Sequence, residues 1–315
     1  MGLSLVVGPA HAGKVALLLD RFLEQIDRDP WLVVPNRLEA DRAERELVAR
    51  CNGLLAGTVG TFESLFESLA FGEGTALRLL GEAERHVVLR RVVDDTALPS
   101  ARHPGFADAL ARTLAEVDGA LVEPDDLAEP LAGLVRGYRA ELERLQAWDR
   151  GALRRHAIRR LTSDLDAWDG RPVLAHGFED LTAAEWRLLE ALAARAEVHV
   201  SLPYEPGRAV YASLSRTADD LAALAGRQLV ELPPRADEYL PPSLAHLERE
   251  LFADAPERAG LDGSIRFLEG AGTRGTLELV AEEILAVLRA GTKAEEIAVV
   301  GPSVEAVRVP LEAAF

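Results

Sequence analysis

The sequence predicts an α/β protein built on a parallel sheet, with a phosphate-binding loop near its beginning. Three observations support this prediction. Short apolar runs rich in β-branched residues recur along the chain, and apolar residues at helical spacing separate most of them. The first run leads into a glycine-containing loop and then a helix. Strands that alternate with helices form parallel sheets covered by helices on both faces.

The first strands and helices alternate closely. Residues 3–7 (LSLVV) are an apolar run, and residues 15–26 then carry apolar side chains at helical spacing. Residues 31–35 (WLVVP) repeat the strand pattern, and Asn36 can cap the helix that follows. Residues 54–59 predict a third strand.

A helical region follows the third strand. From residue 76 to about residue 161 the pattern is one of long amphipathic helices punctuated by prolines, with no convincing strand. We therefore expect a helical subdomain inserted into the α/β domain.

The strand pattern then returns. Residues 171–178 and 198–202 predict strands, and residues 183–194 between them predict a helix. Residues 229–232 can add an edge strand. This completes another strand, helix, strand unit of the same sheet.

The last part of the chain predicts the start of another α/β domain. Proline pairs at 233–234 and 241–242 mark a linker, and strands are expected at 264–268 and 297–300 around a helix at 276–290. Residues 263–315 are too few to complete the sheet of an α/β domain. We therefore expect the chain to be a piece of a longer polypeptide. The expected organisation is an α/β domain (1–75 and 166–240), a helical subdomain (76–165), a linker (241–262) and the start of a second α/β domain (263–315).

Composition predicts a soluble protein with a sizeable core. Of the 315 residues, 48% are apolar, and no apolar run approaches the ~20 residues that a bilayer span needs. The N-terminus lacks the pattern of a secretory signal, so we expect a cytoplasmic protein with no membrane partner. The lone cysteine, Cys51, excludes an intramolecular disulfide and a cysteine-rich metal site within the chain.

The charges restrict the partners. A formal net charge of −17 opposes broad, sequence-independent attraction to DNA, so any contact with nucleic acid must be local. Among 35 basic residues only Lys14 and Lys293 are lysines. One of these two lysines falls in the glycine-containing loop.

That loop matches a phosphate-binding motif up to its last position. Its glycines allow backbone N–H groups to point at phosphate oxygens, and the lysine can reach the terminal phosphates of a nucleotide such as ATP. A glycine-containing turn in an unrelated sheet is the alternative. Val15 stands where Ser or Thr would offer a hydroxyl to Mg²⁺, which puts metal positioning and hydrolysis in doubt. The residues expected to bind the cofactor are Gly8, His11, Ala12, Gly13, Lys14 and Val15.

An ATPase also needs carboxylates at the end of a later strand, to hold the metal and orient water. Glu179 and Asp180 follow the strand expected at 171–178 and are the candidates. The alternative is that Asp180 and Thr182 cap the next helix, and we favour it because the strand ends in Ala-His-Gly. A weakened acidic site beside a weakened loop predicts little or no turnover.

Two places can contact single-stranded DNA. Thr61 and Phe62 follow a strand, where a hydroxyl can meet a phosphate and a ring can stack on a base, although a capping Thr and a buried Phe fit equally well. The densest basic cluster can touch a nucleic-acid backbone, or can be a solvated, salt-bridged helix face. It consists of Arg154, Arg155, His156, Arg159 and Arg160.

No other catalytic set is apparent. The sequence shows no nucleophile paired with a base, and the seven histidines show no metal-ligand spacing. We expect each histidine to be only a core or surface residue, with His11 an exception by position alone.

Taken in order, several segments resemble the N-terminal half of AddB-type subunits of bacterial helicase-nuclease complexes, which derive from UvrD/Rep-like superfamily-1 helicases. They are the loop at 5–14, LVVP at 32–35, VGTFESL at 59–65, GEAERHVVLRR at 81–91, GFEDLTAAE at 177–185, and the segments 275–284 and 297–301. The resemblance covers essentially the whole chain.

The resemblance implies a P-loop (RecA-like) fold with degenerate motifs. It also implies a protein that works with an AddA-type motor and nuclease in double-strand break repair, where the helicase fold is largely a scaffold for scanning single-stranded DNA. The alternatives are an active superfamily-1 DNA helicase, which uses Glu179 and Asp180 with Mg²⁺, and a small-molecule kinase of the P-loop class. In proteins of the AddB type, a nuclease domain with an iron-sulfur cluster lies near the C-terminus, and none of it is in these 315 residues. The later helicase motifs are missing too, so this chain alone is expected neither to unwind nor to cut DNA.

Overall fold

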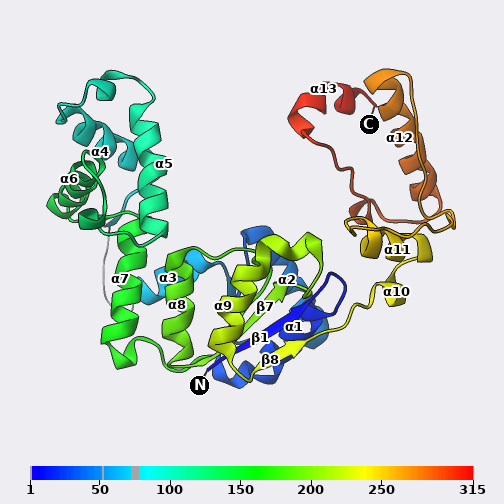
Figure 1. Ribbon diagram of the computed structural model, residues 1–315, viewed down its shortest axis with the longest axis horizontal. Coiled ribbons are helices and arrows are strands. Elements are labelled where there is room, and N and C mark those ends of the chain that lie inside the picture. The colour runs from blue at the N-terminus through cyan, green and yellow to red at the C-terminus, as the bar shows by residue number, and fades with distance from the viewer. Residues whose placement is uncertain (1, 52, 72–77, 315) are drawn as a thin grey trace. The chain divides into compact units, whose positions relative to one another are not determined.

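The computed structural model describes residues 2–51, 53–71 and 78–314. The chain divides into two compact units (Figure 1). One unit runs to Tyr239 and includes Phe252–Asp254, and the other comprises Leu240–Leu251 and the chain from Ala255 onward. Each unit is described separately below.

A six-stranded parallel sheet forms the centre of the first unit, in the order β3-β2-β6-β7-β1-β8. Its strands are β1 (Gly2–Gly8), β2 (Trp31–Val33), β3 (Thr58–Gly60), β6 (Val173–Ala175), β7 (Glu197–Pro203) and β8 (Leu229–Glu231). The predicted α/β fold with a parallel sheet is confirmed, and β8 is the expected edge strand.

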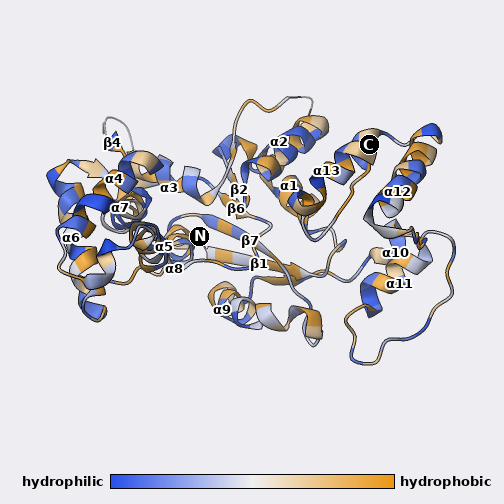
Figure 2. Cartoon of the chain, turned by 90° about the horizontal axis from the view of Figure 1, so that it is seen from above, coloured by the Kyte–Doolittle hydropathy of each residue, from blue (hydrophilic) through white to orange (hydrophobic). Residues whose placement is uncertain are grey.

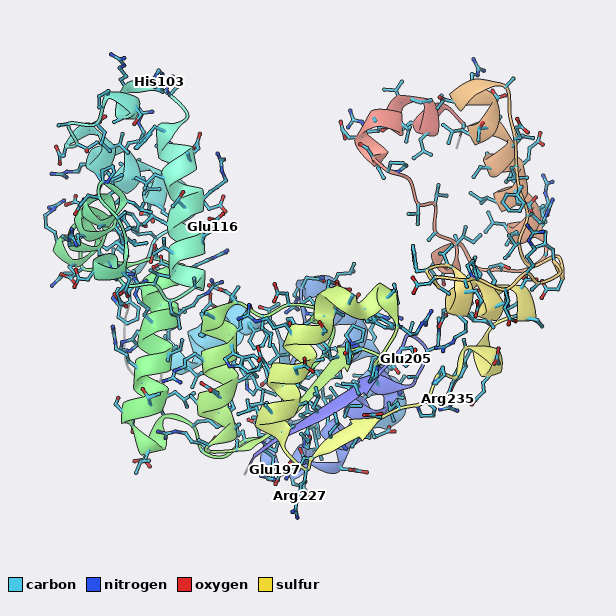
Figure 3. The ribbon with its side chains drawn as sticks, viewed as in Figure 1. His103, Glu116, Glu197, Glu205, Arg227 and Arg235 are labelled. Atoms are coloured by element: carbon cyan, nitrogen blue, oxygen red, sulfur yellow. The ribbon has the colours of Figure 1, made fainter. Side chains whose placement is uncertain are left out.

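The strands end together at one edge of the sheet. Gly8 at the end of β1 pairs with Pro203, and Val33 of β2 pairs with Ala175 of β6. Figure 3 shows the polarity: Glu205 and Arg235 follow strands at this carboxyl edge, whereas Glu197 and Arg227 lie at the opposite edge. Side chains that follow β1, β2 and β6 are therefore brought to one edge of the sheet, where ligands of such folds bind.

Helices cover both faces of the sheet. The helices α1 (Lys14–Glu24) and α2 (Arg37–Cys51) lie on one face, and α3 (Phe62–Phe71), α7 (Arg150–Ser163), α8 (Ala183–Ala193) and α9 (Ser215–Ala225) pack on the other. Figure 2 shows α1 and α2 on one side of the strands and α9 on the other. Successive side chains of β1 point to opposite faces of the sheet, so the strand contributes to the cores on both faces. Leu5 and Val7 pack in the core that includes α8, and Val6 packs in the core that includes α1.

The expected helical insertion is present between β3 and β6. Its helices α4 (Glu82–Asp94), α5 (Phe106–Gly119) and α6 (Leu131–Arg144) share a core around Tyr138 and Leu114, and α7 then returns to the sheet. Two short strands, β4 (Arg78–Leu79) and β5 (Ala147–Trp148), pair in parallel at its base. The expectation of no strand here was wrong, because a pair of two-residue strands leaves no period in the sequence.

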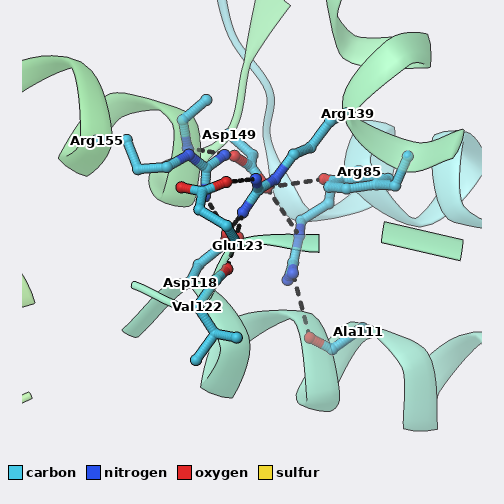
Figure 4. A network of polar contacts seen from close by, with 10 residues as sticks. Arg85, Ala111, Asp118, Val122, Glu123, Arg139, Asp149 and Arg155 are labelled. Carbon is cyan, nitrogen blue, oxygen red and sulfur yellow. Dashed lines mark hydrogen bonds and ion pairs between the residues drawn. The ribbon is translucent and has the colours of Figure 1, made fainter. Parts of the chain in front are cut away.

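Buried charges join the insertion to α7 (Figure 4). Asp118 of α5 forms ion pairs with Arg139 of α6 and Arg155 of α7. Asp149 accepts hydrogen bonds from the Tyr138 hydroxyl at 2.9 Å and from the Ala152 backbone N–H at 2.8 Å. Burial raises the pKa of Asp118, and the positive charge of Arg155 opposes that rise.

The second unit contains α11 (Pro242–Glu250), α12 (Gly272–Arg289) and α13 (Val304–Ala314). The helix predicted at 276–290 is present, and part of the segment expected as a linker is the helix α11. The strands predicted at 264–268 and 297–300 are not formed. Phe267 and Val300 are 86% and 91% exposed. A lone extended segment has no neighbour to satisfy its backbone groups, so the apolar pattern alone does not produce a strand.

The remaining elements are short. They are α10 (Ala236–Tyr239) and the 3₁₀ helices Ile26–Arg28, Pro99–Arg102, Pro124–Asp126, Leu165–Ala167, Ala209–Leu214 and Ala294–Glu296. Among the described residues, no helix combines the length and the apolar character that crossing a bilayer would require.

Candidate nucleotide site

The loop between β1 and α1 has the backbone that its glycines predict. Gly13, directly before α1, has a φ of +87°, which favours glycine, and His11 is also left-handed at +55°. A Cβ atom on Gly8 would lie 2.9 Å from the Cβ of Ala12 and 3.0 Å from the carbonyl oxygen of Leu232. Both glycines of the motif are therefore required by local geometry.

Lys14 is held inside this loop. Its side chain is buried, with 8% of the residue exposed, and its Nζ donates hydrogen bonds to the carbonyl oxygens of Gly8 at 2.8 Å and Pro9 at 2.5 Å. Lys14 is also the first residue of α1, whose first N–H groups have no carbonyl partner within the helix. An ammonium group and the positive end of a helix thus lie together, an arrangement suited to a phosphate.

A pocket of about 860 Å³ opens beside the loop. The predicted loop residues His11, Ala12, Gly13, Lys14 and Val15 line it, whereas Gly8 lies at the end of β1 and contributes its carbonyl to Lys14. The other lining residues are Ala10, Ala16, Leu18, Leu19, Leu32, Val34, Glu39, Arg42, Ala43, Glu46, His176, Gly177, Glu179, Pro203 and Tyr239. This volume is within the range of small-molecule and cofactor sites.

His176 occupies the position directly after β6, where an ATPase of this type would place a carboxylate. It lines the pocket, and its Nδ1 lies 2.6 Å from the Oγ of Ser201 on β7. Burial lowers the pKa of His176 to about 4, and the positive charges of Lys14 and Arg42 add to the lowering. The imidazole is therefore neutral at pH 7. His176 is a half-buried residue of the pocket wall, and the expectation that it is only a core or surface residue stays a prediction.

The two candidate acidic residues are separated by the structure. Glu179 lines the pocket, but Asp180 does not, and its Oδ1 accepts a hydrogen bond from the Leu181 backbone N–H at 2.8 Å. Thr182 is the N-cap of α8 and forms a capping box with Glu185. The favoured alternative, in which this segment caps the helix, is confirmed for Thr182.

Two positions that would offer oxygen ligands to Mg²⁺ in a hydrolysing site do not offer them here. The side chain of Val15 lines the pocket without an oxygen, and a neutral imidazole stands at the end of β6. No group of three or more His, Cys, Asp or Glu residues able to hold a metal occurs in the described part of the chain. Mg²⁺ requires near-octahedral oxygen coordination, which these side chains do not supply.

Curated proteins similar to the chain carry one name. No family model matches the sequence. Three bacterial proteins, each named as the AddB component of an ATP-dependent helicase/deoxyribonuclease, match 92% of the chain. They are 26% identical in Pelotomaculum thermopropionicum, 30% in Moorella thermoacetica and 22% in Desulforamulus reducens. The resemblance to AddB-type proteins is confirmed. The chain spans 29% of the length of each of these relatives.

Two segments on which the AddB resemblance rests meet at the pocket. Gly177, which opens the segment GFEDLTAAE, has a φ of +87°, and a Cβ there would lie 3.0 Å from the Cδ of Pro35. Pro35 ends the segment LVVP after β2. Gly177 therefore packs directly against the ring of Pro35, and a residue with a side chain would not fit there.

The predicted DNA-binding residues after β3 have internal contacts. The Oγ1 of Thr61 accepts a hydrogen bond from the Ser64 backbone N–H at 3.3 Å, at the start of α3. Phe62 is 4% exposed, and its ring centroid lies 4.7 Å from that of Phe178. The structure thus has a capping Thr and a buried Phe, and contact of this segment with DNA stays a prediction.

Most arginines of the basic cluster on α7 are bound to different partners within the chain. Arg154 donates to Glu63 of α3 at 2.7 Å, and Arg155 pairs with Asp118. Arg160 donates to the carbonyl of Leu69 at 2.7 Å. Arg159 is the exposed arginine of the set. The helical spacing therefore does not gather these side chains into one free basic face.

Sequence reasoning missed several residues of the pocket. Glu39, Arg42 and Glu46 reach it from α2, and Tyr239 reaches it from α10. The sequence could have indicated His176 and α2, because each follows a predicted strand and parallel strands end at the same edge of a sheet. Nothing in the sequence indicated Tyr239, which comes after a proline-rich segment beyond the last strand.

Proposed function

We propose that this chain is a helicase-like scaffold within a helicase-nuclease complex of DNA double-strand break repair and recombination. It binds a nucleotide such as ATP at the Lys14 loop, with little or no turnover of its own. One observation carries the proposal: the phosphate-binding loop is intact around a buried Lys14, whereas Val15 and His176 stand where metal-binding oxygens belong. Nucleotide binding needs the loop and its lysine, whereas hydrolysis also needs metal-binding oxygens, which Val15 and His176 do not supply.

The partners follow from the relatives. Proteins named as one component of an ATP-dependent helicase/deoxyribonuclease support a role alongside another component, which we propose is an AddA-type motor and nuclease in the cytoplasm. The proposed substrate is single-stranded DNA. The exposed Arg159 is the best-placed member of the α7 cluster for contact with a phosphate, because its neighbours Arg154 and Arg155 are already paired within the chain.

Nucleotide binding and turnover can be tested separately on the full-length protein. Binding of a fluorescent ATP analogue should weaken at least about tenfold in Lys14→Ala, because a charged contact to phosphate is lost. Lys293→Ala is the matched control, since Lys293 is the other lysine and is exposed in the second unit.

ATP hydrolysis should stay at background with and without single-stranded DNA. A DNA-stimulated rate that Lys14→Ala abolishes would contradict the scaffold. It would favour an active superfamily-1 helicase that uses Glu179, the acidic candidate that does line the pocket.

A further inference from the structure

Arg42 differs from the other arginines of α2. Arg37 pairs with Asp41 at 2.9 Å, Arg45 donates to the Asp41 carbonyl at 3.1 Å, and Arg50 pairs with Asp20 at 2.5 Å. Arg42 lines the pocket beside the phosphate-binding loop. Across residues 2–51, 53–71 and 78–314 its guanidinium has no ion-pair or hydrogen-bond partner. In a chain with 52 acidic residues, an arginine that faces a pocket without a carboxylate partner is available to an anionic ligand.

Lys14 and Arg42 are two cations that line the pocket. Both Lys14 and Arg42 line the pocket together with His176, and the positive charges of both add to the lowering of the pKa of that histidine. Three glutamates also line the pocket, of which Glu46 is neutralised by Arg50 at 2.7 Å. Glu39 and Glu179 remain to oppose an anion, so two cations are needed to balance them.

We propose that the pocket binds the polyphosphate of a nucleotide as the metal-free anion, with Arg42 supplying the positive charge that Mg²⁺ supplies in a hydrolysing site. A guanidinium can form two parallel hydrogen bonds to phosphate oxygens and carries its charge at any physiological pH. It does not coordinate or activate a water molecule as a metal ion does. A site built from Lys14 and Arg42 therefore binds without turning over.

This inference rests on the proposed nucleotide binding at Lys14, and one set of measurements tests both. The probes are a fluorescent ATP analogue and inorganic tripolyphosphate as its competitor, each titrated into the full-length protein in EDTA and in excess Mg²⁺. The variants are Arg42→Ala, Lys14→Ala and, as a matched control on the same helix, Arg45→Ala, whose guanidinium is exposed and bonded to Asp41.

We expect the affinity in EDTA to equal or exceed that in Mg²⁺, because the metal would neutralise the charge that Arg42 recognises. Arg42→Ala should weaken both probes about tenfold in EDTA, and Arg45→Ala should change neither more than about twofold. The loss in Arg42→Ala should shrink as ionic strength rises, since the guanidinium is exposed.

Three results would count against the proposals in different ways. Affinity that falls about tenfold in EDTA, with Arg42→Ala unchanged and Lys14→Ala defective, overturns the metal-free site and leaves nucleotide binding intact. Equal losses in Arg42→Ala and Arg45→Ala overturn the specific role of Arg42. No binding of either probe under any condition overturns nucleotide binding itself.

Discussion

At the scale of single residues, the proposal that the pocket binds a nucleotide without Mg²⁺ depends on Val15 and His176. Both lie beside Lys14, one on α1 and one after β6, and neither offers the oxygen that a magnesium ion needs. The rest of the loop keeps its geometry, including the left-handed Gly13. On this proposal, two side chains separate a site for phosphate alone from one that would also position a metal.

Restoring oxygen ligands at these two positions should restore a response to metal. In the double variant Val15→Thr with His176→Asp, we expect Mg²⁺ to raise the affinity for a fluorescent ATP analogue by about tenfold, because a hydroxyl and a carboxylate are added. The measurement is a titration with and without Mg²⁺. Val15→Thr with His176→Asn, which lacks the carboxylate, is the control. If the affinity is the same with and without Mg²⁺ in both variants, the site lacks more than these two groups.

The lowered pKa of His176, about 4, predicts how stability depends on pH. An unfolded chain protonates this histidine below its ordinary pKa near 6.5, whereas the folded chain resists protonation down to about 4. Between these values the unfolded state binds more protons, so the stabilisation is complete above about pH 6.5 and is lost as the pH falls toward 4.

We expect His176→Gln to remove about 2 kcal/mol of the change in unfolding free energy between pH 7 and pH 5. Urea unfolding at the two pH values measures it, and His103→Gln, at an exposed position, is the control. His199, whose pKa burial also lowers to about 4, should give a similar dependence. An unchanged pH dependence in His176→Gln would mean that its burial does not persist in solution.

At the scale of elements, a buried carboxylate, that of Asp118, joins the helical insertion to α7 of the α/β domain. Asp118 of α5 faces Arg139 of α6 and Arg155 of α7 (Figure 4), and a Cβ on Gly151 would collide with it. Helices α5 and α7 can approach closely here because Gly151 leaves room for that carboxylate.

Removing the charge of Asp118 should loosen this junction. Asp118→Asn leaves two arginines facing a neutral amide, and we expect a cost of about 3 kcal/mol, the range for a buried pair that loses one partner. Hydrogen exchange of the α5 amides measures the loss locally. Glu123→Gln removes a more exposed partner of Arg139 and should cost less than about 0.5 kcal/mol. Equal effects of the two substitutions would show that burial of Asp118 does not matter.

At the scale of the whole molecule, the sequence predicted the sheet better than the pocket. Strand β1 has a largely apolar run, and β7 places apolar residues at every second position, so both patterns predict strands. The roles of Arg42 and His176 depend on which strands and helices meet at one edge, and that meeting is a property of strand order, which no local pattern contains. The β4 and β5 pair was missed for the opposite reason, since two residues are too few to show a period.

The second unit shows the limit of apolar pattern as a predictor. The segments 264–268 and 297–300 have strand-like composition, but a strand exists only when a neighbour accepts its backbone hydrogen bonds. In the chain as described, these segments have no such neighbour, and Phe267 and Val300 stay exposed. Ser264 donates its backbone N–H to Asp262 Oδ1, and Ile297 donates to the carbonyl of Ala294. The remaining N–H groups of the two segments are open to exchange with water, unlike those of β6, which lies between two strands of the sheet.

Hydrogen exchange of the intact chain tests this difference directly. We expect peptides covering 264–268 and 297–300 to exchange at least about a hundredfold faster than peptides covering β6 and β7, because local exposure needs no unfolding of a core. The amides of α12 serve as the internal control, since that helix satisfies its own hydrogen bonds within the same unit. Protection of 297–300 equal to that of β6 would mean that the segment pairs as a strand in solution, as its sequence alone predicts.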